Sequence, residues 1–462
     1  MNKAFEKYLE EAIGRENALV AFSAFGSPAS VSVRRNPFKL ASPPEFSVDG
    51  CTLQGRQVSW CPYGMMLDRR PQFTLDPVFH AGAYYVQDSS SMFVGHVFRE
   101  VLSGMDRPSS RPLRVLDLCA APGGKTTDIV ASLREACGDA FILVANEVMK
   151  ARVGVLADNV ALWGDPNVVV TCDDPHAFAP LSGYFDIVVA DVPCSGEGMF
   201  RKDEQARQQW SEDNVALCEG RQRRIVADVW PSLCQGGVLV YSTCTFNKHE
   251  NDGNVKWIAE NLGADVMPAV VASGGVLLTE CGYSLVPGLV EGEGQYCASL
   301  RKTSGQEYAD GYMGRQNGRA VKQPAVPENP DGLFSIEMKF SMKGDMLTAV
   351  PENISSDVAM LRQHLHVVAA GCAVGVFKGK TLVPDADLAL SIALSQDAYP
   401  RAEVDRQTAL SYLHRDAIVL RDAPLGYVLI CHQGLPLGFV KNLGNRCNSL
   451  HPQSRRIRMN VQ

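Results

Sequence analysis

Five short apolar segments alternate with longer helical patterns between residues 114 and 300 and constrain the fold most strongly. They are Arg114–Cys119, Phe141–Asn146, Val168–Cys172, Asp186–Asp191 and Val238–Thr243. Each is rich in Val, Ile and Leu with little polar alternation, which is typical of strands buried on both faces. Strands separated by helices form parallel sheets, so the sequence predicts an α/β fold with a doubly wound, Rossmann-like sheet.

The regions around these strands divide the chain into five predicted parts. They are an N-terminal α/β segment at 1–110, the central domain at 111–303, a polar linker at 304–331, an intermediate region at 332–390 and a small β-rich module at 391–462. A helix is predicted over Lys3–Ile13. Two later runs predict a hairpin at the edge of the sheet, Tyr283–Pro287 and Tyr296–Lys302, and two more predict a hairpin in the last module, Gly426–Ile430 and Leu437–Val440.

The charge of the chain is unevenly distributed. A net charge of −7 over 462 residues argues against indiscriminate nucleic-acid binding. From Ala423 onward, however, there is no Asp or Glu, and five basic residues follow, Lys441, Arg446, Arg455, Arg456 and Arg458. This tail is either a solvated basic face or a surface for an acidic partner.

Cysteine usage and apolar run lengths limit the class of protein. None of the 14 cysteines forms a CxxC pair, which disfavours a zinc or iron–sulfur module, so we expect no metal. No uncharged apolar run reaches the roughly 18–20 residues of a membrane helix, and the charged first residues lack an apolar signal region. We therefore expect a cytoplasmic protein with free thiols and no membrane contact, and we favour a monomer.

A glycine-rich turn follows the first predicted strand, at the edge where open α/β sheets bind ligands. It consists of Cys119, Ala120, Ala121, Pro122, Gly123 and Gly124, and a helix is predicted from Lys125. A phosphate loop needs GxxxxGK[ST], and Gly124-Lys125-Thr126 matches only its end because Cys119 replaces the leading glycine. The turn also lacks a GxGxxG dinucleotide fingerprint.

S-adenosylmethionine is the third cofactor that such a turn accommodates. It needs a tight turn for its methionine portion and a carboxylate for its ribose diol. Glu147 ends the next strand, 23 residues beyond Gly124, in the position of a ribose-binding acidic residue. Asp174 follows the third strand and either contacts the adenine amino group or caps a helix. The pattern favours S-adenosylmethionine, and a nucleotide phosphohydrolase built on Gly124-Lys125-Thr126 remains a competing hypothesis.

Two cysteines follow two strands of the same predicted sheet. Cys194 comes three residues after Asp191, and Cys244 comes directly after the fifth strand. A thiolate that adds to C6 of a pyrimidine converts C5, a poor nucleophile, into an enamine-like carbon that can attack a methylsulfonium. Asp191 is placed to stabilise the adduct at N3 of the base. A single cysteine is more often a packing residue, but two at matched strand ends indicate this chemistry.

Three motifs in this order resemble the Sun/nucleolar-protein family of RNA cytosine-5 methyltransferases. They are Leu116–Thr126 (LDLCAAPGGKT), Asp191–Phe200 (DVPCSGEGMF) and Tyr241–Thr245 (YSTCT). The match is closest to the bacterial RsmF-like branch, which modifies small-subunit ribosomal RNA. Gly438–Asn445 and Arg455–Arg458 resemble the PUA-like RNA-binding module that ends this branch. The resemblance covers most of the chain and is weakest over about 305–390.

The resemblance implies roles for individual residues. Cys244 would be the nucleophile, and Cys194 would promote elimination and release of the methylated RNA. Contacts to S-adenosylmethionine would come from the turn 119–125 and from Glu147, Asp174 and Asp191. Two departures from the family pattern, Val192 and Cys172, alter the shape of the cofactor pocket without removing a catalytic group.

RNA is the implied substrate, either ribosomal RNA or the small ribosomal subunit, with 16S ribosomal RNA favoured. A base inside a helix is inaccessible, so the target nucleotide must be unpaired or flipped. The candidate RNA contacts are Arg34, Arg35, Arg201, Lys202, Lys441, Arg455 and Arg456. A transfer RNA cytosine-5 methyltransferase and a non-catalytic RNA-binding ribosome-assembly factor remain alternatives.

Overall fold

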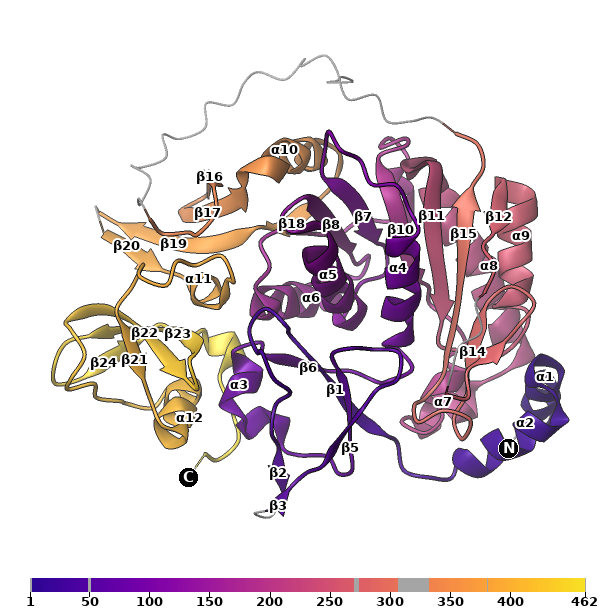
Figure 1. Ribbon diagram of the computed structural model, residues 1–462, viewed down its shortest axis with the longest axis horizontal. Helices are drawn as coiled ribbons and strands as arrows, with labels where there is room; N and C mark the ends of the chain where they lie inside the picture. The colour runs from indigo at the N-terminus through magenta and orange to yellow at the C-terminus, as the bar shows by residue number, and fades with distance from the viewer. Residues whose placement is uncertain (1, 49–50, 270–273, 306–331, 380, 462) are drawn as a thin grey trace.

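A mixed sheet of ten strands forms the centre of the computed structural model, which describes residues 2–48, 51–269, 274–305, 332–379 and 381–461 (Figure 1). The strands follow the order β13-β14-β15-β11-β10-β7-β8-β9-β18, and β12 pairs with β15. The predicted linker at 304–331 lies outside the described residues from position 306 onward.

The five predicted strands are all present as the parallel part of this sheet. They are β7 (Leu113–Asp117), β8 (Phe141–Asn146), β9 (Val168–Thr171), β10 (Phe185–Asp191) and β11 (Leu233–Thr243). The strand order reverses between β7 and β10, and the loops that leave these two strands open a crevice at their carboxyl ends. The doubly wound sheet is confirmed, and this crevice is where a cofactor binds in such folds.

Antiparallel strands close one edge of the sheet. They are β12 (Ala264–Val266), β13 (Leu277–Leu278), β14 (Tyr283–Leu285) and β15 (Gln295–Lys302). The predicted edge hairpin corresponds to β14 and β15, and β15 pairs along the whole apolar half of β11 from Val238 to Thr243.

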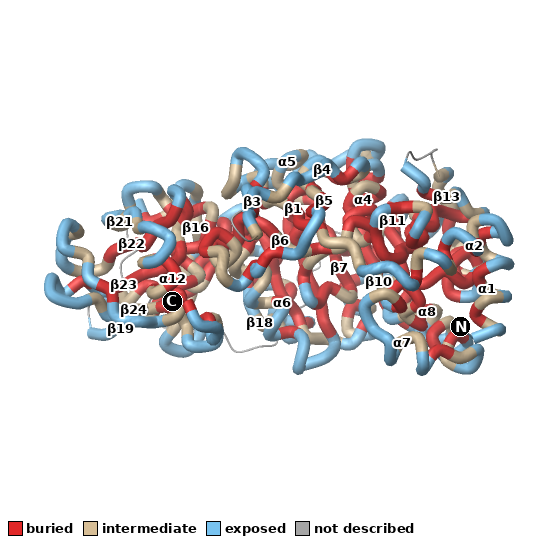
Figure 2. The backbone as a smooth tube through the Cα atoms, turned by 90° about the horizontal axis from the view of Figure 1, so that it is seen from below, coloured by how far each residue is buried: buried red, intermediate tan, exposed pale blue. Residues whose placement is uncertain are grey.

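Helices cover both faces of the sheet. One face is covered by α4 (Phe93–Ser103), α5 (Gly124–Cys137) and α6 (Lys150–Trp163), and the other by α8 (Glu212–Val229), α9 (Asp252–Leu262) and α10 (Ser355–His364). The strands between them are buried (Figure 2). Each large apolar side chain removed from water contributes about 1.5–3 kcal/mol, so these two layers dominate stability. Within the described residues, no helix has the length and apolarity needed to cross a membrane.

The N-terminal segment forms its own small sheet. Helices α1 (Lys3–Ile13) and α2 (Arg15–Ala24) precede an antiparallel sheet of β4 (Gly55–Gln57), β5 (Gly64–Leu67), β1 (Val31–Arg35) and β6 (Tyr84–Val86). The remaining elements are β2 (Ser47–Val48), β3 (Cys51–Thr52) and α3 (Pro77–His80). The predicted helix over Lys3–Ile13 is confirmed. Although α4 lies inside 1–110, its apolar face packs on the central sheet.

The intermediate region adds a second sheet and one strand of the first. The second sheet contains β16 (Met338–Lys343), β17 (Met346–Pro351), β19 (Cys372–Lys378) and β20 (Thr381–Pro384). Between them, β18 (Val367–Ala370) leaves to pair antiparallel with β9. A region without a readable chemical motif therefore completes the edge of the central sheet.

The last module contains α12 (Arg406–His414) and a sheet of β21 (Arg401–Glu403), β22 (Gly426–His432), β23 (Leu435–Asn442) and β24 (Cys447–Ser449), and α11 (Ala386–Leu390) precedes it at the end of the intermediate region. The predicted hairpin is confirmed, and both of its strands are longer than expected. Gln433 and Gly434 form its two-residue turn with positive φ angles of 51° and 75°, as the tight turn of a twisted hairpin requires.

Candidate active site

Cys194 and Cys244 lie side by side beyond the carboxyl ends of β10 and β11. Their sulfur atoms are 3.0 Å apart, and the backbone N–H of Cys244 donates a hydrogen bond to Cys194 Sγ at 3.3 Å. The two strands are parallel neighbours with Asp191 opposite Ser242. This register brings together two cysteines that are 50 residues apart in the sequence.

The surroundings of Cys194 favour its protonated thiol. The hydrogen bond to Cys244 and burial both raise the pKa of Cys194 well above its usual range. A thiol that keeps its proton can donate a hydrogen bond to a neighbouring thiolate. A protonated Cys194 can therefore donate to Cys244 Sγ across the 3.0 Å contact.

Lys125 places a positive charge at the same edge. Its ammonium nitrogen lies 2.8 Å from Asp191 Oδ2, and it also interacts electrostatically with Cys244. Burial alone would lower the pKa of Lys125, but the charge of Asp191 and the hydrogen bond to it outweigh burial and raise that pKa. Asp191 Oδ1 accepts a hydrogen bond from Ser242 Oγ at 2.8 Å. Asp191 of β10 and Ser242 of β11 thus together fix the position of the Lys125 ammonium group beside Cys244.

Glu197 organises the loop that carries Cys244. Its buried carboxylate accepts hydrogen bonds from Trp210 Nε1 at 2.8 Å and from the backbone N–H groups of Phe246 and Asn247 at 2.7 and 3.1 Å. It also accepts from the side-chain amide of Asn247 at 3.0 Å. Trp210 follows α7 (Glu204–Gln209) and packs against Phe5 of α1. The N-terminal helix thereby supports the loop after Cys244.

Glu250 supports the other side of the pair. Its carboxylate accepts hydrogen bonds from the backbone N–H of Ser195 at 3.0 Å and from Gln222 Nε2 at 2.7 Å. Burial raises the pKa of Glu250 to about 7, although these hydrogen bonds act in the opposite direction. Ser195 also contacts Thr245 through their hydroxyl groups at 2.9 Å. A buried polar network therefore holds both cysteine loops.

The glycine turn has the open backbone that a cofactor loop needs. Gly123 has a φ of 112°, which L side chains rarely adopt, and it caps α5. Arg152 from α6 donates to the carbonyl of Ala121 at 2.7 Å, and Asn159 donates to that of Pro122 at 2.8 Å. Two side chains from α6 therefore hold the turn through its carbonyl groups.

Carboxylates around this turn fit S-adenosylmethionine. Asp117 Oδ1 is buried and has no hydrogen-bond partner among the described residues, and burial raises the pKa of Asp117 to about 7. Glu147 is buried at the end of β8 with Arg152 at 3.3 Å. With Asp191, there are three acids here for the two cations Lys125 and Arg152. An orphaned carboxylate oxygen in an acidic crevice suits a cofactor with a sulfonium and an ammonium group.

Asp174 follows β9 and Cys119 follows β7. Asp174 caps the short helix Pro175–Phe178 by accepting from the backbone N–H of His176 at 3.1 Å, and its carboxylate lies 3.7 Å from Arg224. The capping role is present, and the adenine contact remains a prediction. Burial raises the pKa of Cys119, so this thiol stays neutral.

The phosphate-loop alternative does not fit the geometry. Lys125, which would hold the phosphates, is paired with Asp191, and Thr126 Oγ1 donates to Asp117 at 2.6 Å. In a P-loop, the lysine contacts phosphate and the hydroxyl contacts Mg²⁺. Here Lys125 and Thr126 instead contact the carboxylates of Asp191 and Asp117.

Three of the predicted RNA contacts need correction. The Arg34 side chain has no exposed area and donates a hydrogen bond to the carbonyl of Gly124 at the start of α5. The Arg201 side chain is 8% exposed and forms an ion pair with Glu293 at 3.1 Å. The Arg455 side chain is 13% exposed and forms ion pairs with Asp158 and Asp387. The sequence alone does not show whether a basic side chain forms an ion pair with a carboxylate from a distant segment.

The other four candidates have part of their surface in solvent. Lys441 is exposed beside the ring of Tyr427, and Lys202 is 34% exposed with Asp88 at 3.2 Å. Arg35 is half-buried and donates to the carbonyl of Ala41 at 2.8 Å, and Arg456 is half-buried near His414. Their role in RNA binding remains a prediction.

Sequence reasoning missed several residues that shape the site. Three of them are acidic residues inside or near the glycine and cysteine motifs, namely Asp117, Glu197 and Glu250. Their closeness to these motifs in the sequence is the signal that could have identified them. Gln295 donates to Asp191 Oδ1 at 3.2 Å from β15, a strand that carries no motif. Only the pairing of β15 with β11 reveals this contact.

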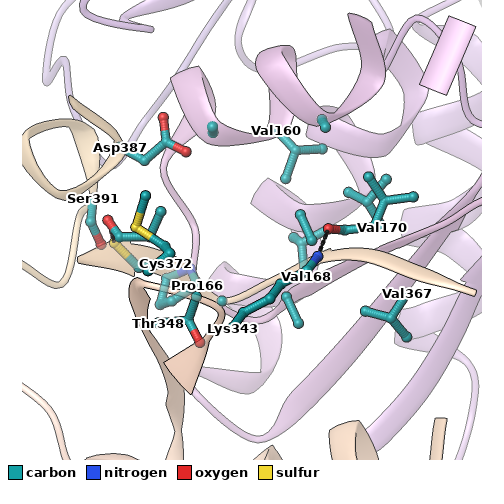
Figure 3. A pocket seen from close by; sticks show the side chains of 18 of the residues that line it. Val160, Pro166, Val168, Val170, Lys343, Thr348, Val367, Cys372, Asp387 and Ser391 are labelled. Atoms are coloured by element: carbon teal, nitrogen blue, oxygen red, sulfur yellow. Dashed lines mark hydrogen bonds between the residues drawn. The ribbon is translucent and has the colours of Figure 1, made fainter. Parts of the chain in front are cut away.

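A cavity of about 640 Å³ lies away from the cysteines, between α6, β9 and the second sheet. In Figure 3, Val160 and Val170 face it from the central domain, and Thr348, Cys372 and Ser391 face it from the C-terminal half. It contains none of the predicted catalytic or cofactor residues, so its size does not identify the active site.

Three family descriptions match successive parts of the chain. They are the N-terminal domain of 16S rRNA methyltransferase RsmF at residues 1–89, 16S rRNA methyltransferase RsmB/F at 108–301 and the methyltransferase RsmF PUA domain at 399–457. The order of these matches follows the predicted order of segments, and the PUA match covers the β21–β24 module.

Two curated relatives are both named ribosomal RNA small subunit methyltransferase F. The protein from Erwinia tasmaniensis is 30% identical, with alignment over 86% of this chain and 84% of its own. The protein from Enterobacter sp. (strain 638) is 29% identical, with alignment over 97% of this chain and 94% of its own.

Solved structures show the same fold. A methyltransferase homolog from Pyrococcus horikoshii is 25% identical with a TM-score of 0.53, covering 65% of this chain and 95% of its own. NSun6 from the same organism, solved with SFG, has a TM-score of 0.50 at 18% identity, covering 66% of this chain and 98% of its own, and shows the fold alone.

The resemblance to the RsmF-like branch is therefore confirmed, as are the Rossmann-like domain and the C-terminal PUA domain. The methyltransferase domain uses S-adenosylmethionine, in agreement with the carboxylates around its glycine turn. Since a 30% identical relative aligns over 84% of its length, the chain belongs to the family of ribosomal RNA small subunit methyltransferase F.

Proposed function

We propose that this protein methylates C5 of a cytosine in 16S ribosomal RNA through covalent addition of Cys244 to C6. The observation that carries the proposal is the pair of thiols 3.0 Å apart at the carboxyl edge of the sheet, beside the cation Lys125. Two neighbouring sulfur atoms have a use in addition and elimination at a pyrimidine, whereas direct methyl transfer to an oxygen or nitrogen needs neither.

The chain's residues perform the reaction in two halves. S-adenosylmethionine supplies the methyl group as a sulfonium. The Cys244 thiolate forms a bond to C6, and the C5–C6 π electrons move to C5, which takes the methyl group from the sulfonium and leaves S-adenosylhomocysteine. Water then takes the C5 proton, the electrons of the C5–H bond re-form the C5–C6 double bond, and those of the S–C6 bond return to Cys244 Sγ. A hydrogen bond from the protonated Cys194 stabilises the departing thiolate, which accounts for its role in product release.

Binding of the RNA calls for an exposed basic surface near the crevice. We propose that Lys441 and Arg446 on the PUA domain contact phosphates, with Lys202 nearer the crevice, because their side chains remain in solvent. Such contacts weaken as salt rises. A ribosomal RNA substrate places the protein in the cytoplasm, on free RNA or on the assembling small subunit.

The test uses the full chain with labelled S-adenosylmethionine and three substrates, 16S transcript, isolated small subunits and transfer RNA. 5-Methylcytidine is measured by mass spectrometry, and covalent RNA–protein adducts are resolved on denaturing gels. Wild type is compared with Cys244→Ala and Cys194→Ala, and Cys51→Ala is the matched control because Cys51 is exposed and far from the sheet edge.

We expect no methylation by Cys244→Ala and accumulation of adducts by Cys194→Ala, with Cys51→Ala unchanged. Methylation by Cys244→Ala would overturn the covalent mechanism. Activity on transfer RNA alone would show that the substrate is transfer RNA and not 16S ribosomal RNA. RNA binding without methylation of any of the three substrates would favour the assembly-factor alternative.

A further inference from the structure

Arg34 is the largest charged side chain sealed inside this protein, and it lies at the start of the cofactor-binding helix. It extends from β1 of the N-terminal sheet, and none of its side chain is exposed. A buried guanidinium is costly unless its surroundings compensate it. The groups that contact Arg34 therefore indicate what it does.

The contacts of Arg34 converge on the cofactor turn. Its Nη2 donates to the carbonyl oxygen of Gly124 at 3.0 Å and to Thr127 Oγ1 at 2.6 Å. Its Nε donates to Gln87 Oε1 at 2.8 Å, and Gln87 follows β6 of the same N-terminal sheet. The guanidinium thereby joins the N-terminal sheet to the first turn of α5.

The charge of Arg34 is also directed at this turn. A cation near the N-terminus of a helix opposes the helix dipole, so this position is unfavourable for stability alone. Asp128 of α5 offsets the charge at 3.8 Å, and the ring of Trp163, which ends α6, lies 4.8 Å from the guanidinium carbon. Asp128 of α5 and Trp163 of α6 thus offset the cost of burying this cation. The hydrogen bonds of the cation fix Gly124 and Thr127.

We propose that Arg34 is a positioning residue that presets the glycine turn for S-adenosylmethionine. It touches neither cofactor nor RNA and acts through Gly124 and Thr127. The ring of Tyr85 from β6 would lie 3.3 Å from a Cβ at Gly124, so the N-terminal sheet holds this turn from two sides. The inference rests on the cofactor loop of the proposed methyltransferase and is independent of which base is modified.

The test compares two arginines that share a carboxylate partner. Arg99 contacts Asp128 at 3.2 Å and Ser132 at 3.3 Å, farther along α5, and it does not contact the turn. Lysine keeps the charge but lacks the planar fork that reaches Gln87 and Gly124 together. Arg34→Lys and Arg99→Lys are therefore matched, and Thr127→Val removes one acceptor while Arg34 stays in place.

The affinity for S-adenosylhomocysteine is measured by titration calorimetry, thermal unfolding is recorded without ligand, and kcat and KM for S-adenosylmethionine are determined separately. We expect Arg34→Lys to raise Kd and KM about tenfold, the scale of a lost charge-assisted hydrogen bond, with kcat within about twofold of wild type. Thr127→Val should raise Kd by a smaller factor, and Arg99→Lys should leave Kd unchanged.

Equal Kd values for Arg34→Lys and Arg99→Lys at similar unfolding temperatures would overturn the positioning role. A fall in kcat with unchanged KM would also contradict it. Failure of the wild type to bind S-adenosylhomocysteine would instead count against the proposed function, so the two failures are distinguishable. If Arg34→Lys does not fold, a Thr127→Val protein with wild-type Kd overturns the proposal.

Discussion

Lys125 Nζ and Asp191 Oδ2 are 2.8 Å apart, and this ion pair joins the turn after β7 to the end of β10. The two strands are parallel neighbours, with Asp117 opposite Val189. The pair spans the point where the strand order reverses and lies beside the two cysteines. Removing one partner of a buried pair leaves the other charge uncompensated, so each residue depends on the other.

Asp191→Asn should lower kcat/KM for methyl transfer by about a hundredfold, the scale seen when a preorganised polar contact is removed from an active site. Without the aspartate charge, burial lowers the pKa of Lys125, and the cation beside Cys244 weakens. The measurement is the initial rate of methyl transfer.

Asp186→Asn is the control for this change because Asp186 forms a buried ion pair with Arg111 at the opposite end of β10. It should reduce stability while leaving the rate per folded molecule unchanged. If the two variants reduced that rate equally, the loss would reflect damage to β10 and not the Lys125 pair.

Alkylation should distinguish the two thiols. Because hydrogen bonding to Cys244 and burial raise the pKa of Cys194, its thiolate fraction at pH 8 should be very small. Limited treatment with iodoacetamide should therefore modify Cys244 before Cys194, with the exposed Cys51 as an internal reference. Peptide mass spectrometry over time measures the order, and earlier modification of Cys194 would contradict the assignment of its proton.

Glu197→Gln should destabilise the protein and reduce activity together. Its carboxylate faces four hydrogen-bond donors, so the amide nitrogen of glutamine would oppose at least one of them. One unpaired buried polar group costs about 1–3 kcal/mol. Urea unfolding measures this loss. Glu204→Gln, on the exposed surface of α7, should change neither property.

Stability should decline as pH rises from about 4.5 to about 7 because of Glu250. Burial raises its pKa from 4.5 to about 7, so between these values the native state holds a proton that the unfolded chain has released. Its stabilising contribution is complete below about pH 4.5 and is lost as pH approaches 7, by at most about 3 kcal/mol.

The free energy of unfolding of wild type and Glu250→Gln is compared from pH 5 to 8. The advantage of wild type over the variant should shrink with rising pH, and the exposed control Glu260→Gln should run parallel to wild type. An advantage that stayed constant from pH 5 to 8 would contradict the prediction, because it would mean that Glu250 is already ionised in the native state at all these pH values.

The sequence by itself determined the central sheet, the order of its motifs and the pair of cysteines. Buried parallel strands leave long apolar runs, so Phe141–Asn146 was predicted with the bounds that the structure gives. The glycine turn and the two cysteine motifs are local patterns that directly follow strands. Because parallel strands end at one edge, the meeting of Cys194 and Cys244 was already implied.

Only the tertiary structure decided which charged residues are available and which distant segments complete the domain. Arg34 was predicted to contact RNA and is instead enclosed by Gln87, Gly124 and Thr127. Residues Val367–Ala370 carry no motif, yet they pair with β9 some 200 residues earlier in the chain. Burial and pairing of this kind depend on packing between segments far apart in sequence, and local residue patterns do not encode such contacts.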